Sequence, residues 1–161
     1  MQKTPISSKE LDEKTALSKA AALCSSKECC VSEIEERLVR WGQSPEAQAR
    51  IIAHLIKERY IDEARFCRAF AHDKLRYNHW GRVKIGQALR MLGVSSTDRE
   101  QALRELPEDE YTDILHRLAE AKRPTIKGKS DYECRTKLMR FLLGRGFEMD
   151  IIRDAIDWEE E

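Results

Sequence analysis

Three glycines recur along this chain at nearly constant spacing. Gly93 follows Gly42 by 51 residues, and Gly146 follows Gly93 by 53. Each glycine has apolar residues four and eight positions before it and another ten positions after it. These are Ile34, Leu38 and Ile52, then Ile85, Leu89 and Leu103, then Leu138, Leu142 and Ile156. A period near 50 residues is typical of stacked units that each contact mainly their neighbours, so we expect an elongated, curved array.

A second correspondence supports the repeat, because Tyr60-Ile61-Asp62 and Tyr111-Thr112-Asp113 also lie 51 residues apart. Each stretch is expected to open the first helix of a new unit. Chance similarity is the alternative, since leucine every four residues is common in helices. We predict a flexible segment at 1–10, helical repeats at 11–60, 61–110 and 111–161, and an acidic tail ending the third repeat.

The fold class expected is all-α, because apolar residues recur at spacings of three and four and no run of β-branched residues alternates with polar ones. Three repeats of three helices make about nine helices. Their expected ranges are 11–24, 32–41, 45–59, 62–77, 81–92, 96–106, 108–122, 130–145 and 149–158.

Helix boundaries are predicted from residue types that favour helix ends. Ser32, Ser96 and Ser130 stand where N-caps belong, and Ser32 with Glu35 has the spacing of a capping box. Pro45 fits a first helical turn, and the three repeated glycines follow helix ends.

Composition limits the class of protein. Charged residues make up 36% of the 161 residues, yet the net charge is zero, so any polarity must come from how the charges are distributed. The five cysteines form no C-x-x-C pair, which fits a reducing cytoplasm. The first residues lack the apolar run of a secretory signal, and no segment is long and apolar enough to span a membrane. We therefore expect a soluble cytoplasmic protein.

No catalytic motif is complete. Gly81 and Gly86 have the spacing of a phosphate-binding loop, but Gln87-Ala88 stands where Lys and Ser or Thr are required. The four histidines are dispersed. The cysteines at 24, 29 and 30 could bind a metal or sense redox changes. We favour the interpretation that they are small buried hydrophobic residues or surface thiols without a chemical role. We expect no enzyme activity, no metal and no cofactor.

Two segments are strongly basic. Residues 65–90 carry seven basic residues and one acid, and residues 117–145 carry nine and three, so each has a local charge of +6. The candidate contacts to a partner or to DNA are Arg65, Arg68, Lys74, Arg76, Arg82, Lys84 and Arg90, with Lys127, Lys129, Arg135, Lys137 and Arg140 as a second set. Cationic patches in equivalent places of consecutive repeats suit a polyanion. A solvated helical face is the alternative.

Other residues in the first basic segment have expected structural roles. Asp62 is expected to cap a helix, and Phe66, Phe70, Ile85 and Leu89 to form the core of the second unit. Gly81 and Gly93 are expected to permit tight turns. Trp80 is either a staple that closes the helix break or an exposed anchor, with the staple favoured.

The motifs Ile61-Asp62-Glu63-x-Arg65-Phe66, Trp80-Gly81-x-x-Lys84-Ile85 and Leu89-x-x-x-Gly93-Val94 together resemble the signature of the RecX family, regulators of the RecA recombinase. The third-unit stretch 142–147, Leu-Leu-Gly-Arg-Gly-Phe, adds to the resemblance, which covers about 16–158. The family pattern commonly carries a second acid after the first Asp, and Glu63 occupies that position here.

This resemblance implies a non-enzymatic inhibitor of RecA. Tandem three-helix repeats would lie in the groove of the RecA–DNA filament and limit its extension, ATPase and strand exchange. It implies a role in recombination, DNA repair and the SOS response, as a monomer that contacts RecA and single- or double-stranded DNA without sequence preference. Two alternatives stay open: a free-standing helical DNA-binding module, and a helical scaffold that binds a partner peptide.

Overall fold

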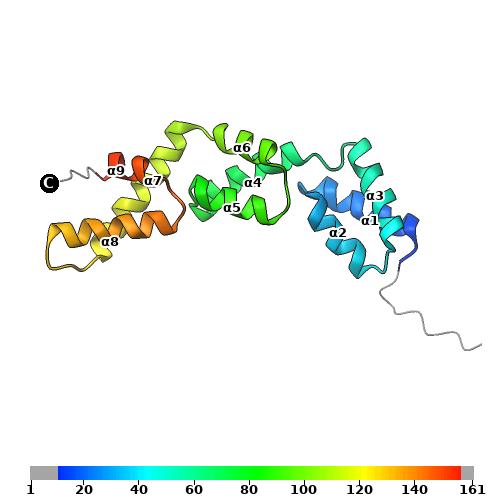
Figure 1. Ribbon diagram of the computed structural model, residues 1–161, viewed down its shortest axis with the longest axis horizontal. Helices are drawn as coiled ribbons and strands as arrows, with labels where there is room; N and C mark the ends of the chain where they lie inside the picture. The colour runs from blue at the N-terminus through cyan, green and yellow to red at the C-terminus, as the bar shows by residue number, and fades with distance from the viewer. Residues whose placement is uncertain (1–10, 157–161) are drawn as a thin grey trace, which may run out of the picture. The chain divides into compact units, whose positions relative to one another are not determined.

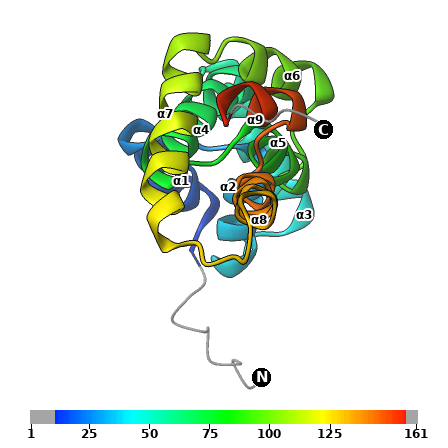
Figure 2. The same cartoon turned by 90° about the vertical axis from the view of Figure 1, so that its left-hand side faces the viewer.

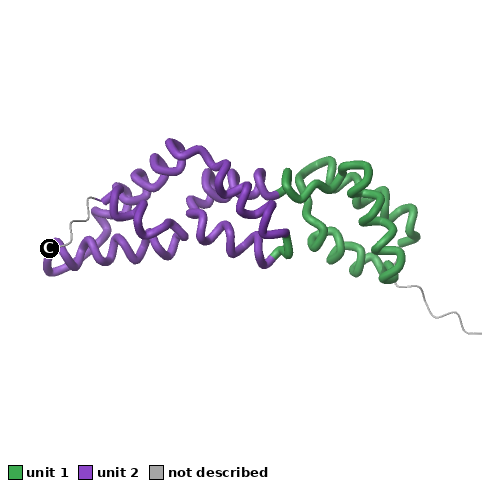
Figure 3. Tube along the Cα trace, turned by 45° about the horizontal axis from the view of Figure 1, so that its top comes forward, with its two compact units in different colours: residues 1–66, 92–94 green, residues 67–91, 95–161 purple. Residues whose placement is uncertain are grey.

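The computed structural model describes residues 11–156, and its regular elements over that range are all helices (Figure 1). The chain forms two compact units (Figure 3). Unit 1 contains residues 11–66 and 92–94, and unit 2 contains residues 67–91 and 95–156.

Unit 1 is built on three helices that pack against one another: α1 (Glu13–Ser26), α2 (Val31–Arg40) and α3 (Pro45–Lys57). Asp12 caps α1 by accepting a 2.6 Å bond from the Thr15 amide, and Ser44 caps α3. The buried core is Ala16, Ala20, Cys24, Cys29, Ile34, Leu38, Ile51, Leu55 and Ile61. Each helix thus contributes one apolar stripe to a shared core.

Unit 2 contains most of α4 (Glu63–Asn78), then α5 (Arg82–Met91), α6 (Ser96–Arg104), α7 (Glu108–Lys122), the 3-10 helix η1 (Arg123–Thr125), α8 (Asp131–Gly144) and α9 (Met149–Ala155). The helices α5 and α6 pack together, and α7, α8 and α9 pack against one another (Figure 2). The Tyr111 and Phe147 rings, both buried, lie 5.2 Å apart. That contact joins α7 to the turn between α8 and α9.

The all-α prediction is confirmed, and residues 11–156 contain all nine expected helices. The observed ends lie within two residues of the predicted ones, apart from the last helix, which ends at Ala155. Three predictions fall outside the described residues: the end of this helix at Trp158, the flexible segment at 1–10 and the acidic end of the tail. None of the described helices has the length and apolar character needed to cross a bilayer.

Two predicted N-caps are wrong. Cys30 precedes α2 without a side-chain cap, and the Ser32 hydroxyl instead donates a 2.7 Å bond to the Leu92 carbonyl, so no capping box forms. Ser95 rather than Ser96 caps α6, by accepting from the Asp98 amide at 3.2 Å. The prediction for Ser130 is confirmed, since it accepts from the Glu133 amide.

The repeated glycines end their helices as predicted. Gly42, Gly93 and Gly146 have φ angles of 76°, 77° and 95°, a backbone region that glycine adopts without a Cβ clash. The predicted role of Tyr111-Thr112-Asp113 needs correction, because α7 begins at Glu108 and Tyr111 lies in its first turn. The buried Tyr111 ring is a core group and does not open the helix.

Candidate functional site

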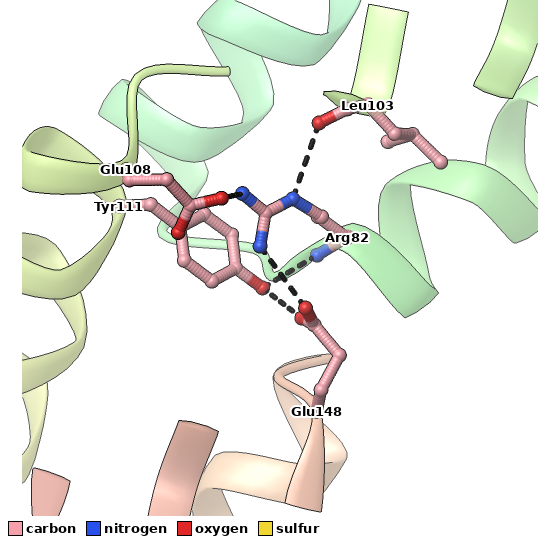
Figure 4. A network of polar contacts seen from close by, with 5 residues as sticks. All are labelled: Arg82, Leu103, Glu108, Tyr111 and Glu148. Carbon is pink, nitrogen blue, oxygen red and sulfur yellow. Dashed lines mark hydrogen bonds and ion pairs between the residues drawn. The ribbon is translucent and has the colours of Figure 1, made fainter. Parts of the chain in front are cut away.

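Arg82 lies at the centre of a polar network within unit 2 (Figure 4). Its guanidinium binds the carboxylates of Glu108 at 2.5 Å and Glu148 at 3.0 Å and donates to the Leu103 carbonyl at 3.1 Å. The same guanidinium lies 3.9 Å from the centre of the Tyr111 ring. With only 14% of its side chain exposed, Arg82 links elements of unit 2 and is not available to a phosphate.

The phenol of Tyr111 completes this network. It accepts a 2.9 Å bond from the Arg82 amide and donates a short bond to the Glu148 carboxylate. Burial raises the pKa of the Tyr111 phenol, and the bond to Glu148 raises it further. Burial opposes the charge of Arg82, but the hydrogen bond and charge of Glu148 outweigh it and raise the pKa of the guanidinium. The network is therefore a fixed, charged structural element.

The turn before α5 meets the turn after α8. The Gly81 amide donates to the Arg145 carbonyl at 2.8 Å, and the Val83 amide donates to the Gly146 carbonyl at 2.9 Å. A Cβ on Gly81 would collide with the backbone of Gly146. Gly81 lies in the short connection between α4 and α5 without a positive φ, and the close approach of the Gly146 backbone is what requires a glycine there.

Arg145 closes the end of α4 by donating from its guanidinium to the carbonyls of Asn78 and His79. These carbonyls lie at the helix C-terminus, where intrahelical partners are absent. His79 adopts a left-handed φ of 54° at this break. Sequence reasoning missed the capping role of Arg145, although its position beside Gly146 in the repeat pattern was a possible signal.

Two further candidate arginines form ion pairs. Arg65 binds Glu28 at 2.5 Å and donates to the carbonyl of Arg59 at 3.0 Å, within unit 1. Arg76 binds Glu110 through two bonds, of 2.5 and 3.2 Å, within unit 2. The hydrogen bond to Arg76 holds the pKa of the Glu110 carboxyl below its ordinary value. Both arginines thus already have carboxylate partners.

Lys74 and Lys84 converge on Trp80. Their ammonium nitrogens lie 4.9 and 4.7 Å from a ring centre of the Trp80 indole, respectively, and the Lys74 nitrogen also lies 5.3 Å from the centre of the Phe70 ring. All three side chains of this Lys74–Trp80–Lys84 cluster are half-buried. Among residues 11–156, neither lysine forms an ion pair. Trp80 thus positions two cations whose charge is not locally neutralised.

The second candidate set lies on and before α8. Lys137 binds Glu133 at 3.3 Å and donates to the Lys127 carbonyl, and Arg135 is half-buried beside Cys134. The remaining candidates are exposed and form no ion pair with any of residues 11–156. These exposed cations are Arg68, Arg90, Lys127, Lys129 and Arg140.

The predicted structural residues mostly occupy the core or cap positions. The Asp62 carboxylate accepts a 3.0 Å bond from the Arg65 amide at the start of α4. Phe66, Ile85 and Leu89 are buried, whereas Phe70 is half-buried. Gly93 has the positive φ expected of a turn residue.

A groove of about 740 Å³ runs between α4 and α7 in unit 2. Ile114, Leu118 and Ala121 line it, and its arginines Arg76 and Arg117 are paired with Glu110 and Asp113. Its rim charges are therefore neutralised within the unit. Residues 11–156 contain no cluster of three or more His, Cys, Asp or Glu side chains that could hold a metal ion.

Comparison with known proteins places this arrangement in a family. Two family models match, described as the second three-helix domain of RecX over residues 62–103 and the third over residues 108–156. The Regulatory protein RecX of Prosthecochloris aestuarii is 32% identical over 146 residues, which cover 91% of this chain and 94% of that protein. The chain belongs to the RecX family. The Regulatory protein RecX of Vibrio parahaemolyticus is 30% identical, with 91% and 94% of the two chains covered.

Solved structures of RecX proteins share the fold. The crystal structure of RecX from Lactobacillus salivarius matches with a TM-score of 0.81 at 21% identity, over 91% of this chain and 95% of that one. A second crystal structure of a regulatory protein RecX also matches with a TM-score of 0.81, at 18% identity, over 91% and 72% of the two chains. The predicted three-helix organisation is thereby confirmed.

Proposed function

We propose that this chain is a non-enzymatic inhibitor of a RecA-type recombinase. In this proposal it binds in the groove of the RecA–DNA filament and limits filament extension, ATP hydrolysis and strand exchange. The observation that carries the proposal is membership of the RecX family. The relatives are named regulatory proteins, and the match covers nearly their whole length.

The charges of unit 2 support a polyanionic partner. Arg68, Arg90, Lys127, Lys129 and Arg140 are exposed and unpaired within residues 11–156, so binding a phosphate or carboxylate would not require an internal ion pair to break. Several weak contacts along one chain raise the overall affinity for a polymer. Arg65, Arg76 and Arg82 contribute to folding instead, because their carboxylate partners lie within the protein.

The direct test is a steady-state ATPase assay of RecA on single-stranded DNA. We expect turnover to fall when this protein is added at less than one molecule per recombinase subunit. An unchanged rate across a full concentration series would contradict the proposal. A parallel titration of DNA without recombinase separates inhibition of the filament from competition for free DNA.

A charge-removal series then tests the exposed cations. Replacing Lys127, Lys129 and Arg140 with Gln should raise the concentration needed for half-inhibition several-fold, since three cation contacts are lost. The matched control replaces Lys14, Arg37 and Lys57, which are also exposed and lie in unit 1. If both triple variants lose the same potency, net charge rather than a defined contact surface is responsible.

A further inference from the structure

The Lys74–Trp80–Lys84 cluster has two features that distinguish it from the other basic residues of unit 2. Its cations come from two helices, α4 and α5, and meet at the break between them. Both lie against one aromatic ring, at 4.9 and 4.7 Å from a ring centre. Contact with an indole restrains long lysine side chains, so less conformational entropy is lost when they bind an anion.

The backbone holds this cluster in place. The Trp80 amide donates a 3.0 Å bond to the Lys74 carbonyl, which ties the indole to the last turn of α4. The next residue, Gly81, is anchored to the Arg145 carbonyl at 2.8 Å. Ile85 and Leu89, both fully buried, fix the helix that carries Lys84. The cluster is therefore supported on both sides of the helix break.

The two ammonium groups form a charge pair suited to an anion. Because each lies within 5 Å of the same indole, the two nitrogens are on the order of 10 Å apart or less. No carboxylate among residues 11–156 forms an ion pair with either of them. A phosphate group placed between them, or two successive phosphates, would neutralise both charges.

Exposed aromatic surface lies next to this charge pair. Tyr77 is 78% exposed and follows Lys74 by three residues on α4, so the two side chains are neighbours on one helix face. An acidic peptide would use the lysines but would gain little from a free tyrosine ring. Single-stranded nucleic acid uses both, because its phosphates need cations and its unpaired bases stack on aromatic rings.

We infer that Lys74, Trp80 and Lys84, with Tyr77 beside them, form a subsite for single-stranded nucleic acid: the lysines bind backbone phosphate, Trp80 positions the lysines, and Tyr77 stacks a base. This inference deepens the proposed function, on which it rests for the biological context of DNA. Binding to the subsite is nonetheless a property of this chain alone and is measurable without recombinase.

The test is fluorescence anisotropy of a labelled oligothymidylate titrated with the full chain over a range of salt concentrations. In the Lys74→Gln/Lys84→Gln variant, affinity should fall about tenfold, and the log–log salt dependence should be shallower by about 1.4, or 0.7 for each lost contact. The matched control, Lys14→Gln/Lys57→Gln, removes the same charge from exposed positions of α1 and α3 and should change affinity less than twofold. Equal losses in both variants would overturn the inference.

A second comparison separates the phosphate contact from the base contact. Tyr77→Ala should weaken binding of oligothymidylate about fivefold or more, because one stacked base is lost. The same variant should bind an abasic strand of equal length as well as the wild type does, whereas the double lysine variant should be impaired on both strands. If Tyr77→Ala leaves oligothymidylate binding unchanged, the stacking role is wrong.

A third measurement addresses the other class of anion. An oligoglutamate of matched charge should compete with the labelled DNA only weakly. Competition equal to that of unlabelled oligothymidylate would assign the cluster to an acidic protein segment and overturn the inference.

If the wild type inhibits RecA ATPase but the double lysine variant binds DNA normally, the subsite fails and the proposed function stands. If DNA binding behaves as expected but RecA ATPase is unaffected, the subsite stands and the proposed function fails.

Discussion

Gly81 and Gly146 meet backbone to backbone, so that a side chain on either would occupy space already filled. On one side, the Gly81 amide donates to the Arg145 carbonyl, and on the other, a Cβ on Gly146 would overlap Lys84. The contact joins the start of α5 to the turn between α8 and α9, and it places Lys84 and the Arg82 network. Glycine is required at both positions for packing, and at Gly146 also for its φ of 95°.

Three Gly→Ala variants separate these two requirements. At Gly144, which ends α8, an added Cβ would contact no neighbouring atom. Gly144→Ala should therefore leave the free energy of unfolding unchanged or raise it by up to about 1 kcal/mol. At Gly93 an added Cβ would also contact no neighbouring atom, but the φ of 77° is strained for alanine. Gly93→Ala should therefore lower the free energy of unfolding by about 1 kcal/mol. Gly146→Ala suffers both strain and overlap, and should cost the most, about 2 kcal/mol or more. Denaturant titration measures all three, and equal costs would contradict the packing explanation.

Arg82 should be more important to stability than any exposed basic residue. Arg82→Met keeps most of the side-chain volume but leaves Glu148 and Tyr111 without their cation, so unfolding should become easier by about 2 kcal/mol or more. Arg82→Lys should recover only part of this loss, because an ammonium group cannot bind Glu108, Glu148 and the Leu103 carbonyl in the same geometry.

Urea titration is the measurement, with Arg76→Met as the control. That variant also removes an arginine–glutamate pair, but the pair is exposed and screened by solvent, so its loss should be much smaller. If Arg82→Met and Arg76→Met destabilise equally, the network around Arg82 has no special structural role.

The sequence pattern predicted the helices well because their apolar positions depend on local periodicity. Ile34, Leu38, Ile85, Leu89 and Leu142 recur at helical spacing, and all five are buried. The glycine spacing located the turns for a similar reason, since a left-handed residue after a helix strongly favours glycine.

The functional residues were harder to predict because their partners lie far away in sequence. Arg82 forms hydrogen bonds with Leu103, Glu108 and Glu148, which are 21 to 66 residues away in sequence, and no local pattern predicts these contacts. Ser32 was mistaken for a cap because its actual acceptor, the Leu92 carbonyl, is 60 residues away. One signal was available: Arg82 and Lys84 correspond, 53 residues later, to Arg135 and Lys137, which suggests a positional role shared by repeats.

The Arg76–Glu110 pair should contribute to acid sensitivity. Glu110 has a folded-state pKa below the ordinary value of 4.5, with the Arg76 hydrogen bond as the largest cause. The unfolded state therefore takes up a proton at higher pH than the folded state does. The stabilising effect is complete above about pH 4.5 and is lost as the pH falls through the folded pKa.

An NMR titration of the Glu110 carboxyl should show its pKa below 4.5 in the wild type and closer to 4.5 in Arg76→Met. Glu13 provides an internal reference, because its pKa is lowered by Arg50 in unit 1 and should not respond to the substitution. A Glu110 pKa that does not change in Arg76→Met would show that the pair is absent in solution.

The cysteines should differ sharply in their reaction with iodoacetamide. Burial raises the pKa of the Cys24 thiol to about 12 and also raises the pKa values of Cys29 and Cys30. At pH 8, only about one in ten thousand Cys24 thiols would be ionised, and the thiolate is the reactive form. Cys134 is less buried and lines a hollow of about 410 Å³ with Ile126 and Leu138, so reagent can reach it.

We therefore expect native protein to be alkylated first at Cys134, with Cys24, Cys29 and Cys30 at least tenfold slower, as followed by peptide mass spectrometry over time. In denaturant, burial no longer distinguishes the sites, and all five cysteines should react at similar rates. A Cys134→Ser variant should then show almost no fast phase in the native state. Fast native labelling of Cys24 would mean that the α1–α2 core opens readily, and that these thiols are more than small hydrophobic residues of the core.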